Sequence, residues 1–341
     1  MDQVTSIKEI AQMCGVSVST VSRVLNGKSY VKEDTRNKVM EAVEKSGFRP
    51  NLLARSLKKG NAKTICLMLP TFGNLIFPEI LRGVNSIATQ NGYTAFFNIT
   101  DEHPGSEEMA YNEMRNLQVA GFIICSAIGD ENPIYRIRED GVPLVLVNRF
   151  QKEDISRLST VSVDNYRVGY VSTQYLIRSG RKRIAIACGD TELYLYTERL
   201  RGYCDALRDA GRKVDEALIL QEPAEGHDGF YDMTKKIMLS ENPPDAFFAT
   251  ADPKAFVIMR ALHDLKLQIP HDVSVVGVDN VELASYMEPP LTTVGQPLNR
   301  MGEEAMRMLL DQIEYKKQYG ELPPPENRVL NFDLIVRKST E

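Results

Sequence analysis

The sequence predicts a small all-α head followed by an α/β body of two doubly wound parallel-sheet halves. Apolar residues in the segment 6–48 follow helical spacing, whereas from residue 64 strand-like and helix-like segments alternate. Charge divides the chain at the same place: residues 1–60 carry 11 Lys+Arg against 6 Asp+Glu, and the remainder carries 30 against 40. A basic head on an acidic body indicates a polyanion-binding module joined to a part that avoids polyanions.

Residues 6–25 have the pattern of two short helices joined by a tight turn. Two apolar series follow helical spacing on either side of Gly15: Ile7, Ile10, Ala11 and Cys14, then Val18, Val21, Val24 and Leu25. Ser17 stands where the second helix needs its N-cap. Ala11 is small enough for a helix crossing, and Gly15 can adopt a left-handed turn conformation. This pattern predicts a helix-turn-helix motif; a generic helical hairpin is the alternative.

The second helix of such a motif enters the DNA major groove, and its amino-terminal residues contact base edges. The predicted DNA-binding residues of the head are Ser17, Val18, Ser19, Ser22, Arg23 and Asn26. Arg23 can form a bidentate pair with guanine, Ser19 can bond several bases, and Val18 can pack on a thymine methyl group. A phosphate contact or a solvated surface position is the alternative for Arg23.

A third helix is predicted from about 32 to 46, with Phe48 closing the small core. The basic segment 49–60 then begins with proline and stops at glycine, as a short helix would. It is too short and too basic to be stable alone. Leu53 and Leu57 lie four residues apart, which suits a helix that forms on DNA and inserts Leu57 between minor-groove base steps. An ordinary interdomain linker is the alternative.

The body alternates buried-strand compositions with amphipathic helices. Expected strands cover 64–70, 93–100, 121–127, 143–148, 160–164, 183–189, 217–221, 245–250 and 274–279, and the end of the chain, 329–337, is also strand-like. Expected helices cover 77–92, 106–119, 197–211, 229–240 and 253–267. Strands separated by helices imply parallel sheets, and this many units predicts two halves. A ligand would bind at the carboxyl ends of the strands, in a cleft between the halves.

Other classes of protein are disfavoured. The body contains no GxGxxG after a strand, and no GxxxxGK[ST], GxSxG or HExxH motif, so an enzyme is not expected. Five scattered cysteines without a CxxC, and four histidines without metal-like spacing, predict reduced thiols and no metal or other cofactor. No apolar run approaches the length of a membrane span, and residues 1–15 lack a secretory h-region.

The head and body together resemble the LacI/GalR transcription regulators. The stretches SIKEIAQMCGVSVSTVSRVLNG and TRNKVMEAVEKSGFRPNLLARSLK are similar to the amino-terminal signature of that family. VSVDNYRVGY, ERLRGYCDAL, IPHDVSVVGVDN and PPLTTVGQP are similar to parts of its periplasmic-binding-protein-like core, so the resemblance covers nearly the whole chain. It implies a cytoplasmic homodimer that binds a palindromic DNA operator. It also implies that Leu57 is the minor-groove wedge, and we expect Arg55 and Lys58 beside it to contact DNA.

Members of the family respond to a small effector, often a sugar or a nucleobase, and the resemblance implies where it would bind. Phe77, Asn148, Arg199 and Asp279 match effector-contacting positions. A guanidinium fork and a carboxylate can hold neighbouring ring hydroxyls, which agrees with this role. A buried ion pair between Arg199 and Asp279 is the alternative, and Phe77 could equally belong to the core. Leu193, Leu195 and Ala251 stand where members often carry polar groups, which predicts a less polar wall.

These observations define a domain plan and a function. We expect a DNA-binding domain at 1–49, a hinge at 50–60 and an effector-binding and dimerisation core at 61–341. Within the core, an N-subdomain would comprise about 61–163 and 294–322, and a C-subdomain about 164–293 and 323–341. The helix near 77–92 and the apolar strip at 298–313 are candidates for the dimer interface or for the core.

The predicted function is a DNA-binding transcriptional regulator, most simply a repressor, under effector control; the alternative is a solute-binding protein without a DNA role. A dimer is favoured over a tetramer because the end of the chain lacks a leucine heptad.

Overall fold

The computed structural model describes residues 6–25, 30–48, 63–100, 106–116, 118–125, 134–222 and 228–341. The chain divides into two compact units, Met1–Ala62 and Lys63–Glu341. Each unit is described by itself below.

The head is a three-helix unit, as predicted. Its helices are α1 (Ile7–Cys14), α2 (Val18–Leu25) and α3 (Glu33–Ser46). Ser6 caps α1 by accepting a hydrogen bond from the Glu9 amide, and Gly15 ends it in the left-handed conformation at φ 65°. The predicted core is confirmed: the buried residues are Ile10, Ala11, Cys14, Val21, Val24 and Val39, with Ile7 and Phe48 packed against them. The turn therefore fixes α2 against α1 through small and β-branched side chains.

The body alternates strands and helices along the chain. Its first part comprises β1 (Thr64–Leu69), α5 (Ile76–Gln90), β2 (Thr94–Ile99), α6 (Ser106–Asn116), β3 (Phe122–Ile124), α7 (Ile134–Glu139), β4 (Leu144–Val147), α8 (Asp154–Arg157) and β5 (Ser159–Val163). Its second part comprises α9 (Asn165–Arg178), β6 (Ile184–Cys188), α10 (Tyr194–Asp209), β7 (Ile219–Gln221), α11 (Gly229–Met238), β8 (Ala246–Ala249), α12 (Asp252–Asp264), β9 (Ser274–Val278), β10 (Thr292–Gly295), α13 (Leu298–Tyr319), β11 (Asn327–Leu330) and β12 (Asp333–Ile335).

These strands form two six-stranded sheets, which confirms the two-sheet body. The first sheet has the order β11-β5-β4-β3-β1-β2, and the second has the order β12-β10-β9-β8-β6-β7. The pairings within the first sheet are parallel, whereas β12 is antiparallel to β10 at the edge of the second. The strands are buried runs because helices cover both faces of each sheet.

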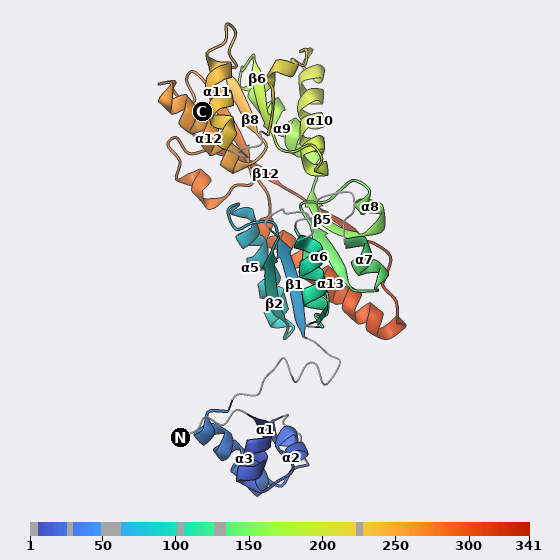
Figure 1. Ribbon diagram of the computed structural model, residues 1–341. Helices are drawn as coiled ribbons and strands as arrows, with labels where there is room; N and C mark the ends of the chain where they lie inside the picture. Colours follow the sequence, from blue (N-terminus) through green and yellow to red (C-terminus); the bar gives the residue numbers. More distant parts are fainter. Residues whose placement is uncertain are drawn as a thin grey trace. The chain divides into compact units, whose positions relative to one another are not determined.

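Alternate strand residues face different helices, which gives each sheet two cores. In the first sheet Ile65 and Leu67 pack with α5 and α13, while Cys66 packs with α6 and α7. In the second sheet Ile184 packs with α9 and α10, and Ala185 packs with α11 and α12. Figure 1 shows α9 and α10 on one side of β6 and β8, with α11 and α12 on the other. The helix at 77–92 and the strip at 298–313, offered as interface candidates, therefore cover the first sheet.

The chain passes between the sheets three times: from β5 to α9, from β10 to α13, and from β11 to β12. The expected domain plan needs a correction at the last of these passages. We expected 323–341 to lie wholly in the second half, but β11 pairs in parallel with β5 of the first sheet, from Asn327 with Thr160 to Leu330 with Val163. Strand-like composition does not show which sheet edge a strand joins. Here a side-chain hydrogen bond favours the first sheet, because the Thr160 hydroxyl donates to Asn327 Oδ1.

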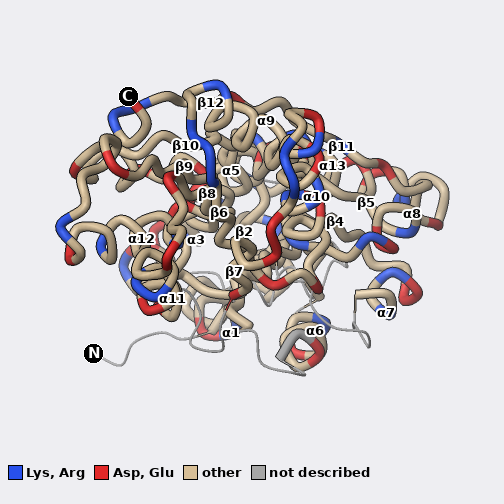
Figure 2. The backbone as a smooth tube through the Cα atoms, turned by 90° about the horizontal axis from the view of Figure 1, so that it is seen from above, with Lys and Arg blue, Asp and Glu red and all other residues tan. Residues whose placement is uncertain are grey.

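The sequence analysis also missed elements. It did not predict α7, α8, α9 or β10, it began the second-half helix α10 at 197 instead of Tyr194, and it joined β11 and β12 into one strand. On the surface of the body, acidic and basic residues alternate along α10 (Figure 2), where Arg201 pairs with Glu198 and Arg208 with Asp205. Such exposed pairs each contribute little to stability.

Candidate functional site

The head presents the amino-terminal end of α2 to solvent. Ser17, Val18, Ser19 and Arg23 are exposed, and Ser22 is half-buried. The Ser17 hydroxyl oxygen accepts a hydrogen bond from the Thr20 amide at 3.1 Å, which confirms Ser17 as the N-cap. The same oxygen lies 2.7 Å from Ser19 Oγ and 2.8 Å from Thr20 Oγ1. This hydroxyl network fixes the side chains that stand where an HTH helix meets base edges.

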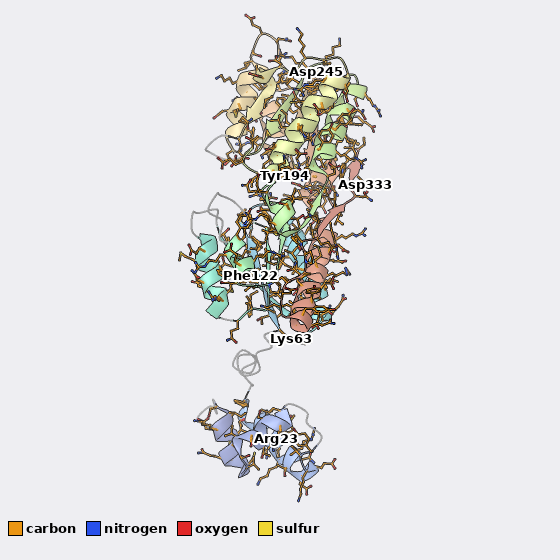
Figure 3. The ribbon with its side chains drawn as sticks, turned by 90° about the vertical axis from the view of Figure 1, so that its right-hand side faces the viewer. Arg23, Lys63, Phe122, Tyr194, Asp245 and Asp333 are labelled. Carbon is orange, nitrogen blue, oxygen red and sulfur yellow. The ribbon has the colours of Figure 1, made fainter. Side chains whose placement is uncertain are left out.

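Arg23 has an aromatic neighbour that the sequence analysis did not single out. Its guanidinium carbon lies 5.8 Å from the centroid of the Tyr30 ring, and Tyr30 is itself exposed. At this distance the guanidinium and the ring are in the range of a weak cation–π interaction. Asn26, Arg55, Leu57 and Lys58 lie outside the described residues. Figure 3 labels Arg23 on the head.

In the body, buried polar groups gather where the strands end. Asn148 follows β4, while Asp279 and Asn280 follow β9. All three have positive φ, at 66°, 120° and 55° respectively. Such backbone conformations cost energy in residues other than glycine and are concentrated at ligand sites. The carboxyl edge of a parallel sheet is the place where the fold itself predicts a ligand.

Arg199, in the first half of α10, is a buried cation with one unused donor. Its Nε donates to Asn165 Oδ1 at 3.0 Å and its Nη1 to the Thr250 carbonyl at 2.6 Å. Its Nη2 has no hydrogen-bond partner among the described residues. Burial lowers the pKa of this guanidinium, and Asp279 opposes that shift. A buried charged donor left unpaired is costly, so the group is suited to an acceptor on a ligand.

Asp279 lies close enough to Arg199 for their charges to interact, although the two form no direct ion pair. Its Oδ1 instead accepts a hydrogen bond from Gln296 Nε2 at 2.6 Å. Burial raises the pKa of the Asp279 carboxyl, while Arg199 and then Gln296 lower it. The alternative of a buried Arg199–Asp279 ion pair is therefore not what the structure shows. Both side chains are held by neutral partners.

The first half contributes Phe77 and Asn148. Phe77 is fully buried in the core of the first sheet, and the Arg149 guanidinium carbon lies 5.5 Å from its ring centroid. Asn148 is buried, and its Oδ1 has no hydrogen-bond partner in the described part of the chain. Phe77 thus belongs to the core, which was the alternative to a ligand contact for this residue. Asn148 instead keeps an acceptor available to a ligand.

The two halves of the body touch each other beside these groups. The rings of Phe150, from the first half, and Tyr194, from the second, have centroids 6.4 Å apart. Tyr194 and Asp333 are labelled where the two halves meet in Figure 3. A pocket of about 850 Å³ is lined by Leu75, Pro78, Glu79 and Arg82 of the first half, by Asp279–Glu282 of the second, and by Gln296–Arg300, where the chain returns to the first half and begins α13. Of the four predicted effector residues, Asp279 is the one that lines it. Its size suits a small molecule.

Sequence reasoning missed several polar residues near Arg199 and Asp279. Asn165, Thr250 and Gln296 hydrogen-bond to the predicted residues, and Lys254 is a completely buried lysine at the start of α12. One signal was available for Lys254: a lysine five residues beyond a buried strand lies in the first turn of the next helix, at the carboxyl edge of the sheet. Leu193, Leu195 and Ala251, expected in a less polar wall, are all buried, and Leu193 and Leu195 pack in a core of the second sheet.

The described residues hold neither a metal site nor a membrane span. No group of three or more His, Cys, Asp or Glu side chains there could hold a metal ion. No helix in that part of the chain is both long enough and apolar enough to span a bilayer.

Comparisons with known proteins agree with this architecture. Residues 6–51 match the family model for bacterial regulatory proteins of the lacI family, and residues 173–340 match the model for a periplasmic binding protein-like domain. The head and most of the second half therefore match two separate models. An HTH head with such a body defines a DNA-binding transcription regulator.

Full-length relatives place the chain in one family. It is 36% identical to the HTH-type transcriptional regulator RegA of Clostridium saccharobutylicum, over 98% of this chain and 99% of the relative. It is 32% identical to catabolite control protein A of Priestia megaterium, over 89% of this chain and 91% of the relative. The chain belongs to the LacI family of transcription regulators, and these relatives are regulators, not enzymes.

Solved structures have the same fold. The transcriptional regulator CelR in complex with cellobiose superposes with a TM-score of 0.74 at 30% identity, covering 98% of this chain and 99% of that one. The lac repressor dimer bound to operator and the anti-inducer ONPF superposes with a TM-score of 0.84 at 24% identity, covering 98% of both chains.

Proposed function

We propose that this regulator is a repressor that binds a palindromic DNA operator as a homodimer, and that a small effector in the cleft of its body controls this binding. The observation that carries the proposal is the exposed amino-terminal end of α2, where Ser17 holds Ser19 and Thr20 in place beside Arg23. The wedge role of Leu57 and the DNA contacts of Asn26, Arg55 and Lys58 remain part of the proposal. As a regulator of transcription, the protein would act in the bacterial cytoplasm.

The homodimer is supported by an exposed aromatic edge. Strand β2 ends the first sheet, and its Phe96 and Phe97 are exposed. Phe72 is also exposed and packs edge-to-face on Phe97, with centroids 5.3 Å apart. A sheet edge with exposed aromatic rings is unusual in a monomer and suits pairing with a second copy. The lac repressor of the same fold is a dimer on its operator.

Effector control is supported by unpaired polar atoms near the carboxyl ends of the strands. Arg199 Nη2 offers a donor, and Asn148 Oδ1 offers an acceptor from the opposite half. A ligand that bonds to both would favour contact between the halves. It would shift DNA binding only by its difference in affinity for the two states of the protein. A sugar or a related metabolite is the expected class, and the similar regulator CelR was solved with cellobiose.

The DNA-binding role is tested with two variants of the head that lose the same charge. Arg23→Ala removes a predicted base contact, whereas Lys38→Ala removes an exposed lysine on α3. With an enriched operator and a scrambled duplex, we expect Arg23→Ala to weaken operator binding by about 1–3 kcal/mol and to relax base preference at one position of each half-site. Lys38→Ala should retain the base preference. Equal base preference in the parent protein and Arg23→Ala would contradict the assignment.

The hinge and cleft assignments are tested in the same binding assay. Leu57→Ala should greatly weaken operator binding while the dimer persists, because the wedge is lost. Arg199→Ala should abolish the effector response while operator binding survives. An unchanged operator affinity in Leu57→Ala, or a normal effector response in Arg199→Ala, would refute the respective assignment.

The solute-binding alternative predicts a different result on truncation. Removing residues 1–60 should leave small-molecule binding under both hypotheses, because Lys63–Glu341 is a compact unit. Only the regulator hypothesis predicts that the full chain binds DNA and that the truncated chain does not.

A further inference from the structure

Two fully buried cations in the second half share one aromatic ring. Lys254 Nζ lies 4.3 Å from the centroid of the Tyr196 ring, and the Arg199 guanidinium carbon lies 5.8 Å from the same centroid. Lys254 is 0% exposed and Arg199 is 1% exposed. Lysine is almost never buried to this extent unless it is paired. The two cations therefore form a defined cluster, with a π face beneath both.

The fold brings these side chains together at one sheet edge. Tyr196 and Arg199 belong to the first half of α10, Lys254 to the first turn of α12, and Glu222 follows β7 directly. The Phe230 ring of α11 also faces Lys254, at 5.8 Å from Nζ. The cluster thus lies beyond the carboxyl ends of β6, β7 and β8, and aromatic rings of α10 and α11 face its ammonium group. This low-polarity surrounding strengthens any charge interaction within it.

The cations have more donors than the protein satisfies. Arg199 Nη2 lacks a hydrogen-bond acceptor among the described residues, and Lys254 Nζ has an ion-pair partner there without the geometry of a hydrogen bond. Lys254 is nevertheless balanced by charge, since Glu222 Oε2 lies 2.9 Å from its Nζ. The Lys254 side chain is fully buried, but that of Glu222 is 19% exposed. Glu222 is therefore the member of the pair that lies nearer to solvent.

We propose that Arg199 and Lys254 bind an acidic group of the effector, a carboxylate or a phosphate, and that this group replaces Glu222 as the partner of Lys254. The inference rests on the proposed effector site and names the chemistry of its ligand. The acidic group would accept hydrogen bonds from Arg199 Nη2 and Lys254 Nζ. The exchange avoids placing a second anion beside Glu222 at the same ammonium, where the two negative charges would repel each other strongly in surroundings of low polarity.

Inorganic phosphate and acetate are the probes, each compared with chloride at equal ionic strength and titrated calorimetrically into the full-length protein. The site predicts binding of at least one of them to the parent chain. Lys254→Met should raise the dissociation constant of that anion about tenfold or more, because a cation is lost from a desolvated site. Glu222→Gln should lower it several-fold, because the competing carboxylate is removed. Lys236→Met, an exposed lysine on α11, is the matched control and should change nothing.

Preference for phosphate or for acetate identifies which acidic group the site takes. The proposal is overturned if neither anion binds better than chloride, or if Lys254→Met and Lys236→Met bind equally well. It is also overturned if Glu222→Gln binds the anion no more tightly than the parent, a result that needs no folded Lys254 variant. Operator binding by the parent is measured in parallel. A parent that binds operator but not the anion contradicts only this inference, whereas a parent that does not bind operator contradicts the proposed function.

Discussion

Asp252 is a buried acid that fixes the start of α12 against the last strands of the second sheet. Its Oδ1 accepts a hydrogen bond from the Thr293 hydroxyl at 2.6 Å, and its Oδ2 accepts one from the Val281 amide at 2.9 Å. Burial raises the pKa of this carboxyl well above its ordinary value, and the nearby Asp279 raises it further. Asp252 thus links α12 to β10 and to the segment that follows β9. The free-energy cost of burying its carboxyl group depends on whether that group is protonated.

This raised pKa predicts a pH-dependent stability. Folded Asp252 binds its proton more tightly than unfolded Asp252, so the group favours folding below the ordinary carboxyl pKa of about 4, and this contribution is lost as the pH rises through the raised value. Asp252→Asn removes it. We therefore expect the melting temperature of the parent, relative to that of Asp252→Asn, to fall as the pH rises above about 4.

Asp272, an exposed acid whose pKa is shifted in the opposite direction, is the control for this prediction. Hydrogen bonds from the Gln268 amide and then from His271 lower the pKa of Asp272, so its contribution to stability is present at high pH and is lost as the pH falls. The melting temperature of the parent, relative to that of Asp272→Asn, should therefore rise as the pH rises. A pH-independent difference between the parent and Asp252→Asn would contradict the account of Asp252.

At the residue scale, the sequence predicted which residues lie at the candidate site better than it predicted their hydrogen-bond partners. The positions of Arg199 and Asp279 followed from the family resemblance, and both lie at the carboxyl edge of the second sheet. Their hydrogen-bond partners, Asn165 and Gln296, lie far away along the chain and have no motif of their own. Lys254 was missed because a lone lysine in a helix resembles any solvated lysine until its burial is known.

Two helix pairs pack at glycines on both partners. A Cβ on Gly83 of α5 would lie 1.9 Å from the Asn299 carbonyl oxygen of α13, and one on Gly302 of α13 would lie 2.1 Å from the Ile80 oxygen of α5. Gly169 of α9 and Gly202 of α10 have the same relation across the second pair. The backbones approach so closely that no side chain fits between them.

The contact of α5 with α13 predicts a large effect from one methyl group. Gly83→Ala should destabilise the body by about 2 kcal/mol: an overpacking cost of about 3 kcal/mol, offset by the higher helix propensity of alanine, about 1 kcal/mol. Asn85→Ala, at an exposed position of the same helix, is the control and should not destabilise. Urea denaturation of Lys63–Glu341 measures both. A Gly83→Ala body as stable as the control would show that the helices are not packed this closely.

The same feature explains why α9 could not be predicted. Its buried face contains Gly169, Ser172 and Thr173, so it shows no apolar stripe at helical spacing. The Ser172 and Thr173 hydroxyls donate to the carbonyls of Val168 and Gly169 within the helix, which satisfies them without a tertiary partner. Periodicity recovers helices that cover a sheet with large apolar residues, such as α5, and fails where close backbone contact replaces them.

At the scale of the whole molecule, the division of charge and the division of structure coincide. The basic segment 1–60 corresponds closely to the first compact unit, and the acidic remainder corresponds to the two-sheet body. Both sheets were predictable because strand-like and helix-like segments alternate. The return of β11 to the first sheet was not predictable, because it depends on pairing with β5 and on the ion pair that Arg328 forms with Glu304 of α13.

The central claim is that this protein reads a twofold-symmetric DNA site, and selection from random duplex DNA at physiological salt tests it most directly. A dimer that places α2 in two major grooves and a hinge in the minor groove predicts a palindrome with a central pyrimidine–purine step, bound with a dissociation constant on the order of 10⁻⁸ to 10⁻¹¹ M. Selection is run with and without pooled bacterial metabolites, so that a need for a corepressor is detected. Enrichment of no sequence, or only of an asymmetric one, in both arms would contradict the account.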